Sequence, residues 1–114
     1  SLLELGDFDS AHREAQPLLE NGDQRSLLLA ARIASAAKDN DMEIRALELL
    51  LKASQHANQN TGGIHVYLAQ AYGEKGFTKK ALAHYRSALQ ENPSSEVRSE
   101  IEKAIAIIQS KALD

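Results

Sequence analysis

The sequence predicts an all-α protein built from helix hairpins, and three observations lead to this fold class. Apolar residues recur at intervals of three and four along most of the chain, which is the spacing of an amphipathic helix. The hydrophobic content of 43% includes only 4% aromatic residues, so the core must be built mainly from Leu, Ile and Ala, residues that favour helix packing. Finally, Ala11, Ala46 and Ala81 follow one another at intervals of 35 residues, which indicates a repeated helix–turn–helix unit.

The first segment, residues 1–22, is predicted to hold the end of one helix and the whole of another. The apolar start SLLEL is followed by Gly6, a residue typical of the position just past a helix end. Asp7 is then expected to cap a new helix that stops before Gly22. Pro17 lies inside this helix, where a proline costs roughly 3 kcal/mol, so we expect a kink or a shortened helix near it.

The next helix is predicted over residues 24–38, with Asp23 as its N-cap. Its Leu, Ile and Ala residues follow helical spacing. A polar turn, residues 39–41, comes after it. Asn40 or Asp41 is expected to cap the helix that follows this turn.

The third helix is predicted from residue 42 to about residue 57. Its Leu, Ile and Ala residues cover so much of its circumference that we expect it to be buried on more than one side. The alternative is that Leu49 or Leu51 forms an exposed ridge for a partner.

Residues 55–63, QHANQNTGG, are predicted to form a loop because they are polar and end in two glycines. Thr61 is expected to cap a helix over residues 63–75. Gly76 then ends that helix, and the second helix of the pair is expected over residues 78–91.

Asn92-Pro93 is predicted to close this unit, and Ser94 or Ser95 to cap a last helix over residues 96–112. Ile107 lies off the apolar stripe of that helix and is expected to face outward. The stripe itself, predicted to be buried, is Val97, Ile101, Ala104, Ile105 and Ile108.

The 35-residue interval extends beyond the three alanines. Gly6, Asp41 and Gly76 are expected to be equivalent turn positions, and further equivalent sets are Ala15, Leu50 and Tyr85, and Leu18, Ala53 and Ala88. The unit over residues 64–93 carries Leu68, Ala69, Tyr72, Gly76, Ala81, Tyr85, Ala88 and Pro93. With this pattern it closely resembles a tetratricopeptide repeat (TPR), a helix–turn–helix unit of about 34 residues.

Residues 27–61 resemble the same repeat more loosely, through Ile33, Ala34, Ala37, Asp41, Ala46, Leu50 and Ala53. Asn58 stands where the repeat usually has proline, and His65 of the following unit stands where it often has tryptophan. The likeness extends over about residues 1–95.

The resemblance implies a solenoid, a right-handed superhelix of TPR helix pairs in which each pair is stabilised by its neighbours. Its implied segments are the C-terminal part of a truncated repeat, two full repeats, and a capping helix or the start of a further repeat. These segments are residues 1–22, 23–61, 62–95 and 96–114. Because the first segment starts in mid-repeat, we expect the chain to be an excerpt from a longer protein.

The residues needed for catalysis or for a cofactor are not expected in this sequence. The four histidines, at positions 12, 56, 65 and 84, are scattered without partners at metal-ligand spacing and are expected to be structural. The chain has no cysteine, so it offers neither a thiol nucleophile nor a thiolate ligand. Gly62-Gly63 lacks the preceding strand and following lysine of a phosphate loop. We therefore expect a protein that is not an enzyme and binds no metal or cofactor.

The net charge of −3 disfavours a nucleic-acid partner, which usually requires a basic face. A basic group (Lys75, Lys79, Lys80, His84 and Arg86) is expected to be a solvated helix face, with an acidic partner as the alternative. No apolar run reaches the length of a membrane span, so insertion into a membrane is not expected. Both a cytoplasmic and a periplasmic location are compatible with this sequence.

TPR proteins usually bind another protein on a concave surface lined by the first helix of each pair. Carried onto this chain, the resemblance implies a groove lined by Leu28, Ala31, Arg32, Ser35, Lys38, Val66, Tyr67, Gln70 and Glu74. Polar side chains around one aromatic and one aliphatic anchor suit a peptide or a helix. Family members that grip the carboxylate tail of heat-shock chaperones use a set of Lys, Asn and Arg side chains. That set is missing here, so chaperone-tail binding is not expected.

The leading prediction is therefore a non-enzymatic scaffold that binds a partner polypeptide. One alternative is a structural or assembly module of a bacterial envelope or secretion protein, for example in exopolysaccharide export. Another is self-association, through the first helix or through Ile107. A further alternative is that the groove residues only support the superhelix.

Overall fold

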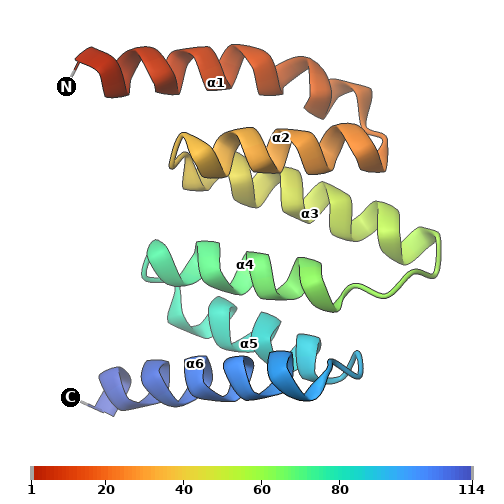
Figure 1. Ribbon diagram of the computed structural model, residues 1–114, viewed down its shortest axis with the longest axis vertical. Coiled ribbons are helices and arrows are strands. Elements are labelled where there is room, and N and C mark those ends of the chain that lie inside the picture. Colours follow the sequence, from red (N-terminus) through yellow and green to blue (C-terminus); the bar gives the residue numbers. More distant parts are fainter. Residues whose placement is uncertain (1, 114) are drawn as a thin grey trace. The chain divides into compact units, whose positions relative to one another are not determined.

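The computed structural model describes residues 2–113 and the side chains of residues 9–111 (Figure 1). Within this range the chain forms helices and no strand, which confirms the predicted all-α fold class. The helices are α1 (Leu2–Asn21), α2 (Gln24–Ala36), α3 (Asn40–His56), α4 (Gly62–Glu74), α5 (Thr78–Leu89) and α6 (Ser95–Leu113). They fall into two compact units, residues 1–59 with α1 to α3 and residues 60–114 with α4 to α6.

In the first unit α1 packs against α2, and α2 packs against α3. Alanine and larger apolar side chains share the contact, and the alanines let the helix backbones approach closely. The buried apolar residues of this unit are Ala11, Ala15, Leu19, Leu27, Ala30, Ala31, Ala34, Met42, Ala46, Leu47, Leu50 and Leu51. Of the two predicted ridge residues, Leu49 is 36% exposed and Leu51 is buried.

The predicted break at Gly6 is wrong, since α1 is one helix from Leu2 to Asn21. A glycine inside a helix costs only about 1 kcal/mol relative to alanine, which is too little to end a helix that continues on both sides. Asp7 is therefore an interior residue and not an N-cap. The helix also continues past Pro17 and is not shortened there. Ala15 and Leu19, buried on either side of Pro17, hold this part of α1 on the core.

The turn between α2 and α3 is a Schellman motif, in which the chain adopts a left-handed conformation just after the helix. Lys38 is the left-handed residue, with φ 61°. Its N–H donates to the Ser35 carbonyl (3.1 Å), and the Asp39 N–H donates to the Ala34 carbonyl (2.8 Å). These bonds end α2 at Ala36, two residues before the predicted end.

Two of the predicted N-caps in the first unit have different outcomes. Asp23 caps α2 as predicted, because its Oδ1 accepts the Ser26 N–H at 2.7 Å. The expected cap of α3 by Asn40 or Asp41 is wrong, since Asp39 accepts the Met42 N–H at 3.2 Å. The Schellman motif fixes the backbone of Asp39 directly before α3. Its carboxylate can therefore accept a free N–H of the first turn of that helix.

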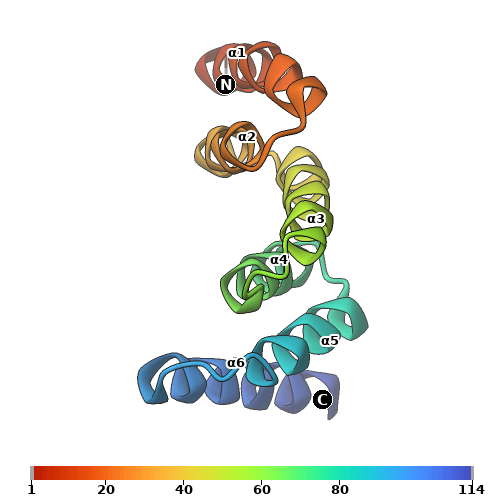
Figure 2. The same cartoon turned by 90° about the vertical axis from the view of Figure 1, so that its right-hand side faces the viewer.

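In the second unit α5 packs against both α4 and α6 (Figure 2). The buried cluster at this contact is Ala69, Tyr85, Ala88 and Ile101, with Val66, Leu89, Ala104, Ile105 and Ile108 packed against it. Of the stripe of α6 that was predicted to be buried, Ile101 is buried and Val97 is 37% exposed in the first turn of the helix. The other three members, Ala104, Ile105 and Ile108, are half-buried. Ile107 lies off the stripe as predicted and is 57% exposed. The prediction of Ser94 as a cap is confirmed, because its Oγ accepts the Val97 N–H at 3.3 Å.

The turn between α4 and α5 is also a Schellman motif, and here the left-handed residue is the predicted Gly76, with φ 82°. Its N–H donates to the Gly73 carbonyl (3.0 Å), and the Phe77 N–H donates to the Tyr72 carbonyl (2.9 Å). The Phe77 and Tyr72 rings lie with their centroids 6.1 Å apart, which supplies the apolar contact that often accompanies this motif.

Thr61 occupies the N-cap position of α4 as predicted, but its side chain does not cap the helix. Instead the Thr61 hydroxyl donates to Glu91 Oε1 at 2.6 Å, and the Thr61 N–H donates to the same oxygen at 3.0 Å. Asn60 Oδ1 accepts the Gly62 N–H at 2.8 Å in its place. The Thr61 side chain therefore ties the start of α4 to the segment after α5.

The 35-residue interval describes only part of the molecule. Ala46 and Ala81 are both buried and keep that spacing, but α2 and α4 begin 38 residues apart, as do α3 and α5. Helix α3 has 17 residues and α5 has 12. Part of the extra length of α3, almost one turn, precedes its buried alanine. Asp41 consequently lies inside α3, and it is Lys38 that is equivalent to Gly76.

Candidate functional site

The outer face of α4 carries three of the residues that the resemblance placed in a groove. Tyr67 is 55% exposed, and Gln70 and Glu74 are exposed at the next two turns. Val66 differs from them, because it is half-buried and packs against the cluster that contains Tyr85. This face of α4 therefore offers one aromatic side chain with two polar neighbours, on a helix anchored by its opposite side.

Helix α2 presents a comparable face. Leu28 is 36% exposed, and Arg32 and Ser35 are exposed as well. Ala31 is only 5% exposed and contributes to packing, while Lys38 lies beyond the helix in the left-handed position of the turn.

Sequence reasoning missed Leu29, which is 47% exposed on α2. Leu29 precedes Tyr67 by the same 38 residues that separate the starts of α2 and α4, and Arg32 precedes Gln70 by the same distance. The two helices thus carry a large apolar side chain at equivalent exposed positions, each followed one turn later by a polar side chain. Leu29 was missed because the 35-residue interval aligns α2 with α4 three residues away from the 38-residue interval of the structure.

A pair of histidines joins α4 to α5. His65 Nδ1 and His84 Nδ1 are 2.9 Å apart, a hydrogen-bonding distance, and the ring centroids are 5.1 Å apart. The prediction that all histidines are scattered is therefore wrong for these two. They are 19 residues apart in sequence and meet because the hairpin brings the start of α4 beside the middle of α5.

The chemistry of this histidine pair is restricted by its geometry. His65 is only 9% exposed. One Nδ1 must carry a hydrogen and the other must offer a lone pair, so at most one of the two rings carries a charge while the bond exists. The pair therefore joins α4 to α5 through a hydrogen bond between two ring nitrogens.

An aromatic series leads from this pair to the surface. The His84 ring stacks on Tyr72 with centroids 5.5 Å apart and an angle of 7° between the planes. Tyr72 in turn contacts Phe77, which is 46% exposed. The Lys80 Nζ lies 5.3 Å from the Tyr72 centroid and 5.7 Å from that of Phe77, and the Lys75 Nζ lies 5.6 Å from the latter. The part-buried histidine pair and the partly exposed aromatic and lysine side chains thus belong to one contiguous set.

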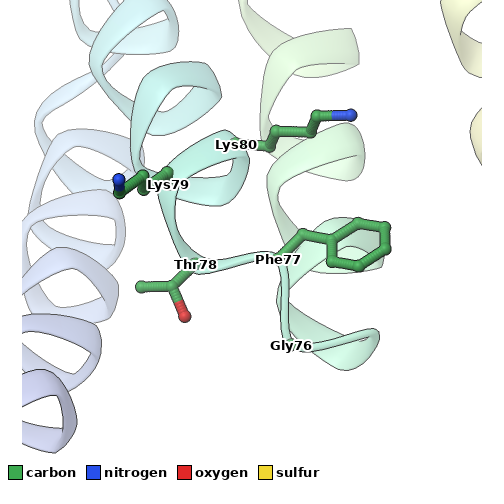
Figure 3. A pocket seen from close by; sticks show the side chains of 5 residues that line it. All are labelled: Gly76, Phe77, Thr78, Lys79 and Lys80. Atoms are coloured by element: carbon green, nitrogen blue, oxygen red, sulfur yellow. The ribbon is translucent and has the colours of Figure 1, made fainter.

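A hollow of about 440 Å³ lies at this end of the hairpin, lined by Gly76, Phe77, Thr78, Lys79 and Lys80 (Figure 3). Figure 3 shows the Phe77 and Lys80 side chains on one side of the turn, and Thr78 and Lys79 on the other. The lining is basic and contains one large apolar ring.

Hydrogen bonds or burial displace the pKa values of Glu91, Asp23 and Tyr85, none of which lines this hollow. Hydrogen bonds from the Thr61 hydroxyl and N–H lower the pKa of Glu91. The Ser26 N–H lowers the pKa of Asp23 in the same way, and burial raises the pKa of Tyr85. The two carboxylates act as hydrogen-bond acceptors for the backbone at the starts of α4 and α2.

Among the residues that the structure describes, no three His, Asp or Glu side chains are grouped as a metal ion would require. None of the described helices is both long and apolar enough to cross a membrane.

No family model matches this sequence, and no curated protein sequence matches it either. Function is therefore inferred from the exposed side chains of the two units.

Proposed function

We propose that the chain is a non-enzymatic scaffold segment that binds a partner polypeptide through the first helix of each hairpin. The observation that carries this proposal is the equivalence of Leu29 and Tyr67, which are 47% and 55% exposed. A single exposed apolar side chain is ordinary on a protein surface. Two large ones at equivalent positions, each beside polar groups, fit the anchors of a binding face.

The proposal includes membership of the TPR class, with the solenoid arrangement and the four segments that the resemblance implies. Its support is the burial of the residues that carry the resemblance in α4 and α5: Leu68, Ala69, Tyr72, Ala81, Tyr85 and Ala88. In such arrays the second helix and the inner side of the first form the core, which leaves the outer side of the first helix for a ligand.

An extended peptide or a helix is the partner that suits each of these helix faces. On α4, Tyr67 supplies apolar contact area and Gln70 a hydrogen-bond donor beside it, and on α2, Leu29 and Arg32 supply the same two elements. A tyrosine anchor is well suited to the purpose, because it has a large contact area and only two side-chain torsions to fix on binding.

A displayed peptide library screened against the 114-residue chain tests this proposal. A binder of the α4 face should be weakened about tenfold or more by Tyr67→Ala and also by Gln70→Ala, and a binder of the α2 face by Leu29→Ala, because central anchors dominate binding energy. A photo-crosslinking residue placed at position 67 should capture the peptide. The matched control places it at Gln109, which is exposed on α6. Binders that tolerate both apolar substitutions, or that crosslink equally at position 109, would contradict the proposal.

A further inference from the structure

The exposed face of α2 differs in charge from the corresponding face of α4. Arg25 and Arg32 are exposed on α2, and no side chain of this helix is acidic. At the positions 38 residues later, α4 carries Gly63 and Gln70, which have no charge. The two faces share an exposed apolar anchor but not these charges, so they suit ligands of different chemistry.

Two arginines and two leucines form one stripe along α2, and we name it the arginine stripe. Its members are Arg25, Leu28, Leu29 and Arg32, at successive spacings that place all four on one side of a helix. Leu28 is 36% exposed and Leu29 is 47% exposed. The stripe is held in place because the other side of the helix is buried through Leu27, Ala30, Ala31 and Ala34.

The helix fixes the distance between the two arginine positions. Arg25 and Arg32 are seven residues apart, which corresponds to about 10 Å along the helix axis. An extended peptide covers nearly the same length in three residues, at about 3.3 Å for each. Two carboxylates three residues apart in such a peptide therefore match the two arginines, with room for apolar side chains between them.

The carboxylate of Asp23 lies near one end of the arginine stripe. It interacts favourably with Arg25 and accepts the Ser26 N–H at 2.7 Å, which holds it at the start of α2. Arg32 is nine residues from Asp23, or about 13 Å along the axis, so salt largely screens this carboxylate from it. Arg32 is consequently the end of the stripe that attracts an anionic ligand more strongly.

We infer that the arginine stripe binds an acidic peptide segment of a partner protein, in which two carboxylates flank apolar side chains. One carboxylate pairs with each guanidinium group, and the apolar side chains pack on Leu28 and Leu29. A guanidinium group can bind a carboxylate through two parallel hydrogen bonds, which gives the pairing direction as well as charge. The inference deepens the proposed function and rests on it, because it names the ligand class of the α2 face.

Two other anionic partners suit the stripe less well. The net charge of −3 opposes attachment of the chain to an anionic membrane surface. Residues 24–36 include no aromatic side chain on which the bases of a single-stranded nucleic acid could stack. A short acidic peptide requires neither a basic protein nor a stacking platform.

Fluorescence anisotropy with the 114-residue chain tests the inference. The probe is a labelled peptide with capped termini, in which two glutamates flank two leucines. We expect saturable binding that weakens severalfold between about 50 and 300 mM NaCl, because the ion pairs are exposed and screened. A peptide of the same composition with its glutamates adjacent should bind about threefold more weakly, since it can pair with only one arginine.

Charge reversal supplies the matched comparison. Arg32→Glu should weaken the probe about fivefold or more, the scale of one exposed ion pair lost and one repulsion gained. Arg86→Glu makes the same change in net charge at an exposed position of α5 and should change binding by less than about twofold. Arg32→Gln gives α2 the residue type that α4 has at Gln70 and should cause an intermediate loss. Leu29→Ala should also weaken the probe about fivefold, because it removes the more exposed apolar anchor.

The uncharged face of α4 allows the reverse experiment. Nothing lies within 4 Å of the position that a Cβ would occupy at Gly63, so an arginine side chain has space there. In a chain without the two arginines of α2, Gly63→Arg combined with Gln70→Arg should restore binding of the probe severalfold. No gain would contradict the pairing of two spaced arginines with two carboxylates and overturn the inference.

Equal losses with Arg32→Glu and Arg86→Glu would show only a general charge effect and would overturn the inference. No saturable binding up to about 1 mM chain would overturn it as well. So would tighter binding of a single-stranded oligonucleotide, or of phosphatidylcholine vesicles with about 30% phosphatidylserine. Circular dichroism spectra of all variants establish that their helices are intact.

The outcome for the proposed function is read separately. A neutral peptide from the displayed library that binds and is weakened by Leu29→Ala supports a binding face on α2. If the acidic probe does not bind the same chain, the inference is overturned and the proposed function stands. If neither peptide binds, both are overturned.

Discussion

The two hairpins α2–α3 and α4–α5 share a backbone design and differ in the residues that build it. Both turns are Schellman motifs, yet the left-handed residue is Lys38 in one and Gly76 in the other. A side chain in this conformation strains the backbone, whereas glycine adopts it readily. The comparison shows that this turn does not require glycine at its left-handed position.

The inner faces of the first helices differ even more. At equivalent positions, 38 residues apart, α2 buries Leu27, Ala30, Ala31 and Ala34, whereas α4 buries His65, Leu68, Ala69 and Tyr72. The inner face of α2 therefore consists mainly of small side chains. That of α4 is bulkier and adds aromatic stacking and one hydrogen bond between ring nitrogens.

Leu68→Ala should have the largest effect, because it gives α4 the residue that α2 has at the equivalent Ala30. Leu68 is fully buried, so we expect the free energy of unfolding to fall by about 2–5 kcal/mol. Urea denaturation measures the loss. Leu29→Ala, the same substitution at an exposed position, is the control and should cost less than about 0.5 kcal/mol. Similar losses for the two variants would mean that Leu68 is not a core residue.

Exchange of the left-handed residues tests the comparison of the turns. Gly76→Ala should destabilise the chain by about 1–2 kcal/mol through strain alone, since a Cβ at this position meets no atom within 4 Å. Lys38→Gly should stabilise it by up to about 1 kcal/mol, partly offset by the greater freedom of glycine in the unfolded chain. Thermal and urea denaturation of both variants provide the values. Stabilisation by Gly76→Ala, or a clear loss with Lys38→Gly, would contradict the left-handed assignments.

The parts of the fold that local signals encode were predictable from the sequence. Asp23, Ser94 and Gly76 act within a few residues of their own positions, and each has the predicted role. The helices themselves follow from the spacing of apolar residues. The α3 start at Asn40 and the continuity of α1 through Gly6 depend on competition between neighbouring segments, which a local pattern does not contain.

Less of the candidate sites was predictable. Tyr67 was expected at the surface from the family resemblance, but Leu29 required the true register of the two hairpins. The histidine pair was missed because its members are 19 residues apart and no motif has that spacing. Only the antiparallel packing of α4 and α5 brings the two rings together.

Removal of the histidine pair should weaken the second hairpin by a smaller amount. His84→Ala breaks the hydrogen bond between the two Nδ1 atoms, which lie 2.9 Å apart, and removes the ring that stacks on Tyr72. We expect the free energy of unfolding to fall by about 1 kcal/mol, the scale of one hydrogen bond.

Urea denaturation at neutral pH measures the effect. His12→Ala and His56→Ala, both at exposed positions outside the pair, are the controls and should cost less than about 0.5 kcal/mol each. A loss for His84→Ala no larger than that of the controls would show that the pair does not stabilise the hairpin.

The smallest effect is expected at lower pH, where the two units behave alike. The pKa of Glu91 is lowered by the Thr61 hydroxyl and N–H, and that of Asp23 by the Ser26 N–H. A carboxyl group with a lower pKa in the folded state stabilises that state above its unfolded pKa. This contribution is lost as the pH falls through the folded value, so stability should decline below about pH 4.

Glu91→Gln and Asp23→Asn should each reduce the slope of that decline in urea denaturation. Because Glu91 joins two segments 30 residues apart whereas Asp23 caps only its own helix, Glu91→Gln should also lower stability at neutral pH more than Asp23→Asn does. The reverse order would show that the tie between Thr61 and Glu91 contributes less than a local helix cap.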